Sequence, residues 1–224
     1  MKVREIHEDY NLEQFNEAYK ILKQRLKINN ISNSIIKNKK ILNICDPSGR
    51  YTFALYKLGA KVVDTFNETS KPKVWKNNYN FKKINLNNKI ISKLSYDLVF
   101  CNGILSHKNN WKKILINLFN VIDNNGYLWL SLYSNGQHWK NADKIKEKLS
   151  KKLINNFIVS LQLRDWEPNK INFLTELFFK ERIYFTKKQI SNFLKKNNFS
   201  EIIYLNRGIK TDLNEKIFND KKLK

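Results

Sequence analysis

The stretch that most constrains the fold of this chain runs from residue 40 to residue 67 and reads as a strand, a tight turn, a helix and a second strand. Its first part, Ile41 to Cys45, is a short apolar run that breaks at once into Asp46-Pro47-Ser48-Gly49. Proline fixes φ and glycine accepts positive φ, so this break predicts a turn. An amphipathic helix then extends to Gly59, a residue typical of a helix C-terminal cap, and a strand begins at Lys61. The pattern predicts a βαβ unit, and the first turn of such a unit is where nucleotides bind.

A second informative block is Tyr96 to His107, with the sequence YDLVFCNGILSH. Its apolar part predicts a buried strand that ends at Cys101, and Asn102-Gly103 turns the chain at the strand's carboxyl end, the edge where α/β sheets bind ligands. A clean helical stripe from Trp111 to Ile122 follows. We expect further strands before and after these two elements, and a short helix near residues 71 to 75. The strands are Asn80 to Leu86 and, beyond a closing loop at Asp123 to Gly126, Tyr127 to Tyr133.

Together the two blocks resemble class I S-adenosylmethionine-dependent methyltransferases. The first motif of that family is an acidic residue, Gly-x-Gly-x-Gly, a helix, then Gly-Ala and a strand that ends in a ribose-binding acid. Leu42 to Tyr51 occupies this motif, Leu58 to Val63 matches its continuation, and Asp97 to His107 resembles the family's fourth-strand motif, in which Asp-Leu-Val is followed by Leu-x-His. The resemblance covers about residues 40 to 205. It implies a Rossmann-like, doubly wound, mostly parallel α/β sheet, with S-adenosylmethionine as the cofactor.

The first motif departs from the family pattern at several positions. Asn43 replaces its acid, Cys45 and Pro47 replace two of its glycines, and Phe66 stands where the ribose-binding acid is expected, with Asp64 and Glu68 two residues to either side. Those glycines normally let the backbone approach the ligand closely, and Pro47 also removes an N–H donor. The sequence thus keeps the frame of the motif while it alters the residues that grip the cofactor.

Motif position nevertheless implies a set of cofactor contacts, in which Asp46 serves as a replacement acceptor. The alternative is that the turn at residues 46 to 49 connects a strand to a helix and binds no ligand, because a lone glycine-rich match is a weak signal. The implied cofactor contacts are Asp46, Ser48, Gly49, Phe66, Asn67, Asn85 and Asn102.

His107 has two interpretations. At the ligand edge it could contact cofactor or substrate, or act as a catalytic base near neutral pH. It could equally cap the following helix or hydrogen-bond the loop, because methyl transfer depends chiefly on holding the nucleophile and the methyl group in line.

About fifty residues separate the fifth strand from the next core element, which is too long for a simple connection. Apolar residues every four positions from Ile145 to Leu161 predict one long amphipathic helix, with Leu149, Leu153 and Phe157 between them. We interpret this segment as a helical cap inserted after the fifth strand, where the resembling family often builds its substrate pocket. A self-packed helical pair is the alternative. The candidate substrate contacts are Tyr133, His138, Trp139, Arg164, Asp165 and Trp166.

The chain is therefore divided into an N-terminal helical segment (1–39), a cofactor-binding core (40–133), the cap (134–185) and a closing part of the core with a basic tail (186–224). In the first part a helix is expected at about residues 11 to 27 and a short one near Ile31 to Ile36. In the last, Thr186-x-x-Gln189 predicts a capped helix, and Glu201 to Leu205 a penultimate strand.

The formal net charge of +22 invites a nucleic-acid interpretation. The lysines are spread along the chain, however, so we expect only weak, salt-sensitive association with polyanions and no specific nucleic-acid site. The two cysteines, Cys45 and Cys101, end apolar runs and predict buried thiols, while the three histidines are too isolated for a metal site. Neither a membrane span nor a signal segment is visible, which predicts a cytoplasmic protein.

The function that these patterns favour is methyl transfer from S-adenosylmethionine to a small molecule. The rival is a catalytically silent member of the family that keeps the fold for binding or as a scaffold, which the altered first motif favours. RNA methylation is a third possibility and would need basic residues gathered at the ligand edge.

Overall fold

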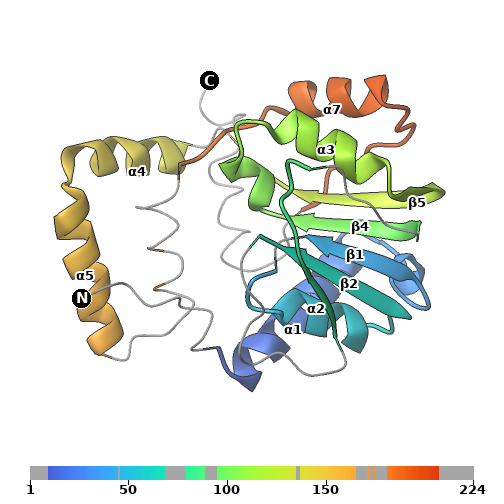
Figure 1. The fold of residues 1–224 in the computed structure, drawn as a ribbon, viewed down its shortest axis with the longest axis horizontal. Coiled ribbons are helices and arrows are strands. Elements are labelled where there is room, and N and C mark those ends of the chain that lie inside the picture. The colour runs from blue at the N-terminus through green and yellow to red at the C-terminus, as the bar shows by residue number, and fades with distance from the viewer. Residues whose placement is uncertain are drawn as a thin grey trace.

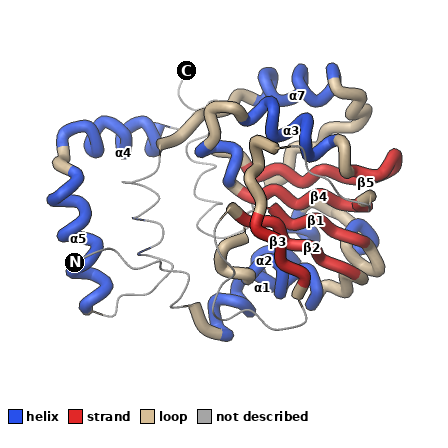
Figure 2. Tube along the Cα trace, viewed as in Figure 1, coloured by secondary structure: helices blue, strands red, loops and turns tan. Residues whose placement is uncertain are grey.

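A computed structural model of the chain describes residues 10–44, 46–68, 79–88, 95–134, 137–164, 171, 174 and 181–206. Its centre is a five-stranded, all-parallel sheet with strand order β3-β2-β1-β4-β5 (Figures 1 and 2). The strands are β1 (Lys40–Ile44), β2 (Val62–Asn67), β3 (Asn80–Lys83), β4 (Tyr96–Asn102) and β5 (Ile122–Ser131). The predicted Rossmann-like sheet is confirmed, and it is wholly parallel.

The strand order reverses between β1 and β4, which both lie in the centre of the sheet. From β1 the chain winds outward through β2 to β3, and then returns to place β4 on the other side of β1. Ile44 pairs with Phe66 on one side and with Cys101 on the other, so the carboxyl ends of β1, β2 and β4 lie together. This reversal is the position where open α/β sheets bind ligands.

Alternation along each strand sends apolar side chains to both faces of the sheet. In β4, Leu98 and Phe100 pack into one hydrophobic cluster, while Val99 and Cys101 pack into the other. A strand that is apolar on both faces must be covered on both, as parallel sheets are. Cys101 is fully buried, which confirms the expectation for that thiol, whereas Cys45 lies outside the described residues.

Helices from different parts of the chain cover the two faces. On one face lie α1 (Leu12–Ile28) and α2 (Arg50–Lys57), with the 3-10 helix η2 (Asn33–Ile35) between them in sequence. On the other lie α3 (Trp111–Phe119), which follows the 3-10 helix η3 (Ile104–His107), and α7 (Lys187–Lys196). The predicted cap of α7 forms, because Thr186 Oγ1 accepts a hydrogen bond from the Gln189 backbone N–H at 3.1 Å.

Two strand boundaries differ from those predicted. The third strand ends at Lys83, and β5 already begins at Ile122 and ends at Ser131, before Tyr133. The register of β5 shifts between the pairs Tyr96–Ile122 and Leu98–Tyr127, so the expected loop at residues 123 to 126 is an irregularity within the strand. The short helix expected at residues 71 to 75 lies outside the described residues.

The predicted helical cap consists of two helices, α4 (Gln137–Lys148) and α5 (Lys151–Leu163), which stand away from the sheet in Figure 1. The expectation of one long helix was therefore wrong. Ser150 interrupts it and caps α5, because its Oγ accepts from the Leu153 N–H at 3.1 Å. The predicted apolar face was also wrong in part: Leu153 and Phe157 are about half exposed, and α5 buries Ile154 instead.

The cap is tied to the N-terminal segment through a small core of its own. Ile154, Ile158 and Leu161 of α5 pack in one cluster with Tyr10, which precedes α1, and with Phe15. Phe15 in turn makes an edge-on ring contact with Phe53 of α2, with 5.6 Å between centroids. The N-terminal segment thus joins the cap to the helix that follows the first turn.

The strand expected at Glu201 to Leu205 is not formed, and these residues are irregular. Ile203 is 71% exposed, and contacts with helices hold the segment: the Tyr204 hydroxyl donates to the Lys187 carbonyl of α7, 3.0 Å away. Asn206 exchanges two hydrogen bonds with the Asn29 side chain at the end of α1. These contacts override the strand propensity of the apolar run.

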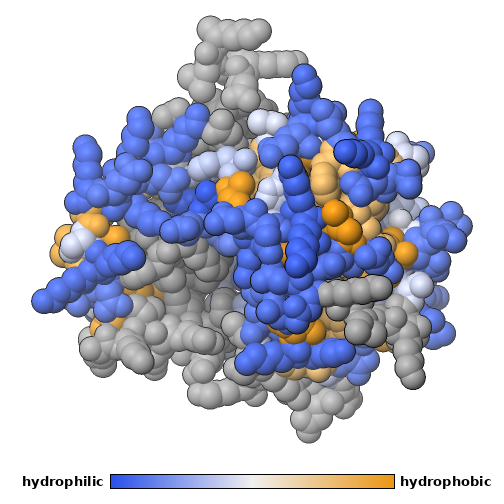
Figure 3. Space-filling model, turned by 45° about the horizontal axis from the view of Figure 1, so that its top comes forward, coloured by the Kyte–Doolittle hydropathy of each residue, from blue (hydrophilic) through white to orange (hydrophobic). Residues whose placement is uncertain are grey.

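Hydrophilic side chains cover most of the described surface in Figure 3, and hydrophobic ones gather only in small separate patches. Among the helices in the described ranges, none is long and apolar enough to cross a membrane.

Candidate functional site at the carboxyl edge of the sheet

The turn that follows β1 is built around Gly49, which adopts the left-handed conformation at φ 76° and precedes α2 directly. The Gly49 N–H donates to the Asp46 carbonyl at 3.1 Å, which closes the turn predicted from Asp46 to Gly49. Any other residue at position 49 would be strained in this conformation. The left-handed backbone therefore explains why this one glycine of the motif is present.

Asp46 is only 3% exposed, and donors of the chain surround its carboxylate. Asn43 Nδ2 lies 3.1 Å from Oδ2, the Thr52 N–H and Oγ1 lie 2.8 and 3.0 Å from the same oxygen, and Ser48 Oγ lies 3.1 Å from Oδ1. Thr52 Oγ1 also lies 2.7 Å from Thr65 Oγ1 on β2. The carboxylate therefore ties β1, the turn and the first turn of α2 together, and its contact with a cofactor stays a prediction.

Asn67 ends β2 beside this turn and is 1% exposed. Its Nδ2 donates to the Asp46 carbonyl at 3.0 Å, which fixes the orientation of the amide. Its Oδ1 is buried and has no hydrogen-bond partner among the described residues. Because an unsatisfied buried acceptor costs about 1–3 kcal/mol, such an atom at the ligand edge fits a donor supplied by a ligand. A ribose hydroxyl is a donor of this kind.

Phe66, the residue aligned with the family's ribose-binding acid, belongs to the hydrophobic core and is 6% exposed. The nearest acid beyond it, Glu68, forms an ion pair with Lys108, which follows η3. This pair joins the end of β2 to the segment after β4. Of the two acids that flank Phe66, Asp64 accepts from the Tyr96 hydroxyl at 2.7 Å and is therefore engaged elsewhere.

Arg50 brings a positive charge to the first residue of α2. Its guanidinium carbon lies 5.2 Å from the centre of the Tyr10 ring and 5.5 Å from that of Tyr51. Burial alone would lower the pKa of Arg50, but Tyr51, Tyr10, Asp46 and Glu17 outweigh it and raise that pKa above its ordinary value. The side chain is thus charged at every physiological pH and lies where the N-terminal segment meets the turn.

The carboxyl end of β4 carries Asn102, partly exposed, and Gly103 with φ 87°. The Gly103 N–H donates to the Ser131 carbonyl at 3.0 Å, which holds the start of η3 against β5. Asn102 therefore lies at the predicted edge. Asn85 lies in the exposed turn after β3, where its Oδ1 accepts from the Asn87 N–H at 2.9 Å. Contacts of both residues with a cofactor remain predictions.

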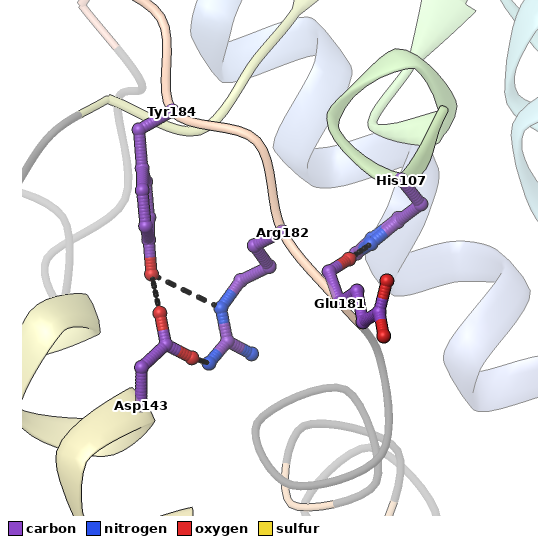
Figure 4. A network of polar contacts seen from close by, with 5 residues as sticks. All are labelled: His107, Asp143, Glu181, Arg182 and Tyr184. Carbon is purple, nitrogen blue, oxygen red and sulfur yellow. Dashed lines mark hydrogen bonds and ion pairs between the residues drawn. The ribbon is translucent and has the colours of Figure 1, made fainter. Parts of the chain in front are cut away.

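His107 ends η3, and its Nδ1 lies 2.6 Å from the carbonyl oxygen of Glu181 (Figure 4). A carbonyl only accepts, so Nδ1 carries the proton and Nε2 of the neutral ring carries the lone pair. Tyr133 packs edge-on against the imidazole with 5.4 Å between centroids. The structure thus brings together His107 and Tyr133, two of the residues singled out in the sequence.

Of the other predicted substrate residues, the structure describes the side chain of Arg164. Arg164 is exposed just after α5, at the end of the cap. His138 and Trp139 belong to α4, but their side chains, like all of Asp165 and Trp166, lie outside what the structure describes.

A polar network that the sequence analysis missed joins the cap to the core. Asp143 of α4 forms an ion pair with Arg182 and accepts from the Tyr184 hydroxyl, while Arg182 Nε lies 3.3 Å from that hydroxyl (Figure 4). The alternation of polar and apolar residues from Arg182 to Phe185 could have indicated an extended segment, but the partner of its polar side chains, Asp143, lies about forty residues away. Within the described ranges, no group of acidic, histidine or cysteine residues could hold a metal ion.

Comparison with solved structures agrees with this architecture, whereas no family model and no characterised protein matches the sequence. PKMT2 from Rickettsia typhi, solved in complex with AdoHcy, matches with a TM-score of 0.52 and 15% identity over 80% of this chain and 43% of that chain. An S-adenosylmethionine-dependent methyltransferase from Mesorhizobium loti matches with a TM-score of 0.38 and 11% identity, over 41% of this chain and 45% of that one. The chain thus spans less than half the length of either protein.

A third similar structure is the 1,6-didemethyltoxoflavin-N1-methyltransferase of Burkholderia thailandensis, with a TM-score of 0.41 and 16% identity over 55% of this chain and 54% of that chain. Its ligands are 1,6-didemethyltoxoflavin and S-adenosylhomocysteine. Many of the similar structures are S-adenosylmethionine-dependent methyltransferases with different substrates. The chain has the Rossmann-like fold of class I methyltransferases, which confirms the resemblance in its sequence.

Proposed function

We propose that this protein binds S-adenosylmethionine at the carboxyl edge of the sheet and transfers its methyl group to a small-molecule acceptor, in the cytoplasm. The observation that carries the proposal is the buried Asn67 Oδ1, an acceptor with no partner in the described part of the chain, at the strand end beside the Gly49 turn. The fold and the ligands of the similar structures support the choice of cofactor.

The residues at this edge suit a nucleoside better than an anion. Asn67 offers an acceptor to a ribose hydroxyl, and Asn102 offers an amide at the end of β4. Gly49 and Gly103, both at positive φ, open the strand ends, and nothing lies within 4 Å of where a Gly103 side chain would begin. When bound, the cofactor supplies an electrophilic methyl group on a sulfonium.

The chain's own contribution is then to orient the acceptor and to take its proton. His107 lies at the same edge and, with Nδ1 bonded to Glu181, presents Nε2 as its basic atom. Holding the acceptor atom in line with the methyl carbon contributes most of the rate enhancement in such a transfer. We assign this positioning to the region between His107, Tyr133 and the cap.

A catalytically silent binding protein is the second candidate, and two observations favour it. Asp46 is engaged by its own chain, and Glu68, the acid nearest the usual ribose position, is paired with Lys108. A silent protein with this site would still bind the cofactor or its product, whereas a scaffold without a site would bind neither.

The test is thermal unfolding with and without S-adenosylmethionine or S-adenosylhomocysteine, at raised salt, because the chain is strongly basic. A ligand that binds only the folded state stabilises it by about 2.7 kcal/mol at a hundredfold excess over its dissociation constant. ATP serves as the control for nonspecific binding of a nucleotide anion. A shift with both sulfur compounds and none with ATP is the expected result, and no shift at millimolar ligand would exclude the cofactor site.

A further inference from the structure

Residues 181 to 185, here called the strap, run in extended form between the core and the cap. Successive residues of an extended chain point to opposite sides. Here the odd residues bond to the core, and the side chains of Arg182 and Tyr184 both contact the cap (Figure 4). The strap therefore connects the core to the cap, and its partners lie about forty or more residues earlier in the chain.

On the core side, the strap bonds to the loop that carries His107. The Ile183 N–H donates to the Ser106 carbonyl at 2.7 Å, and the Phe185 N–H donates to the Tyr133 carbonyl at 2.9 Å. Ser106 Oγ in turn accepts from the Tyr133 N–H at 2.8 Å. These bonds fix the register of the strap against the loop. In this register the Glu181 carbonyl accepts the hydrogen bond from His107.

On the cap side, one carboxylate engages both even residues. Asp143 pairs with Arg182 through Oδ1 and accepts the Tyr184 hydroxyl through Oδ2. The Arg182 side chain is fully buried, and the ion pair with Asp143 compensates its charge. Burial and the bond to Asp143 raise the pKa of Tyr184 above 10 and outweigh Arg182, which keeps the phenol protonated as a donor.

We propose that Asp143, Arg182 and Tyr184 are positioning residues, which hold the strap so that the Glu181 carbonyl fixes the tautomer of His107. The inference rests on the proposed function, in which His107 is the base. In that reaction the acceptor's proton passes to Nε2 while its lone pair bonds to the methyl carbon, and the electrons of the methyl–sulfur bond remain on sulfur. If Nε2 already carried a proton, it could not accept the proton of the methyl acceptor. The tautomer of His107 therefore determines whether Nε2 can act as the base.

The experiment reads the tautomer directly, by two-bond ¹H–¹⁵N correlation of the histidine rings in ¹⁵N-labelled protein. At about pH 8 an ordinary histidine with a pKa near 6.5 is neutral. The nitrogen shifts then report the tautomer alone, without a contribution from the charged ring. His107→Gln assigns the signal. The native protein is expected to show His107 protonated at Nδ1.

Tyr184→Phe and Asp143→Asn are each expected to shift the His107 nitrogens toward the average of the two tautomers. Tyr56→Phe is the matched control, because it removes a hydroxyl that bonds to the Val63 N–H of β2, on the face of the sheet that α1 and α2 cover. The proposal is overturned if His107 remains protonated at Nδ1 alone in both variants while the unfolding midpoint falls. The network would then stabilise the fold without affecting the tautomer. If Asp143→Asn does not fold, Tyr184→Phe alone decides.

The outcome is independent of cofactor binding. If neither S-adenosylmethionine nor its product stabilises the native protein, the proposed function fails, whether or not the tautomer responds. If both stabilise it and the tautomer ignores Tyr184→Phe, the function stands and the positioning role fails.

Discussion

Asn43 Nδ2 lies 3.1 Å from Asp46 Oδ2, and both side chains are almost completely buried. Asn43 occupies the position of the family's acid, so the carboxylate of this turn lies three residues further along the chain. The amide and the carboxylate form a complementary pair, because the amide donates what the carboxylate can only accept. In this chain the carboxylate is supplied by Asp46, and Asn43, at the position of the family's acid, donates a hydrogen bond to it.

Asn43→Asp should therefore destabilise the protein. It places a second carboxylate beside Asp46 in a buried site, and we expect a cost of about 3 kcal/mol, as for an uncompensated buried charge. Asp46→Asn should also destabilise, by about 1–3 kcal/mol, because it weakens the bonds to Thr52 and Ser48. Urea unfolding measures both.

The exchange Asn43→Asp with Asp46→Asn is the sharper measurement, because it restores one carboxylate and one amide. The double variant should recover at least about 1 kcal/mol relative to the sum of the single costs, as contacting residues do. Asn43→Asp combined with Ile154→Ala, in the distant cap, should be additive. Simple additivity in the exchange would mean that the two side chains are not coupled.

Asn67→Ala tests the proposed cofactor contact. Loss of the bond to the Asp46 carbonyl should cost about 1 kcal/mol of stability, and loss of Oδ1 should weaken S-adenosylhomocysteine binding about tenfold. Isothermal titration at raised salt gives the dissociation constant. Asn80→Ala is the control, since Asn80 begins β3 at the opposite edge and bonds to Asp64. Equal affinity in both variants would remove Asn67 from the site.

Asp97 should make stability depend on acid pH. Burial alone would raise the pKa of Asp97, but the Lys40 N–H at 2.7 Å and the Lys39 ammonium at 3.3 Å outweigh it and lower the pKa below 3.8. A lowered folded pKa contributes stability above the unfolded value, and this contribution is lost as pH falls through the folded value.

We therefore expect Asp97→Asn to cost about 1–2 kcal/mol at pH 7, with a difference from the native protein that shrinks below about pH 4. Lys39→Met should cost less, about 0.2–1 kcal/mol, because that pair is partly exposed and the Lys40 N–H remains. Unfolding in urea from pH 3 to pH 7 provides the comparison. If Asp97→Asn lowers the unfolding free energy equally at pH 3 and at pH 7, the effect of Asp97 is steric and does not come from its charge.

Local patterns were sufficient for the part of the fold that places the site. The strand, the Gly49 turn and α2 follow from apolar spacing and turn chemistry within about twenty residues, and the structure confirms them. The environment of Asp46 could not be predicted in the same way. In the sequence Asn43 marks only the absence of the family's acid, and nothing indicates that its amide donates to Asp46. The network of Asp143 with Arg182 and Tyr184 was equally hidden, since only the folded chain brings its members together.

The cap shows how a periodic pattern can mislead. Apolar residues at intervals of four predicted one helix through Leu153 and Phe157, whereas in the structure Ser150 separates two helices and caps the second. Once α5 begins at Lys151, its buried stripe is set by packing against Tyr10, and it falls on Ile154, Ile158 and Leu161. Tertiary contacts therefore chose between two apolar faces that the sequence offered.

This choice of face gives a prediction with a built-in control at adjacent positions. Ile154 is 5% exposed and Leu153 is 57% exposed, so Ile154→Ala should cost about 2–4 kcal/mol and Leu153→Ala less than about 0.5 kcal/mol. Hydrogen exchange of α5 and urea unfolding report the local and global costs. If Leu153→Ala proved the more damaging, the face first predicted from the sequence would be the buried one, and the cap would have to pack against the N-terminal segment in another register.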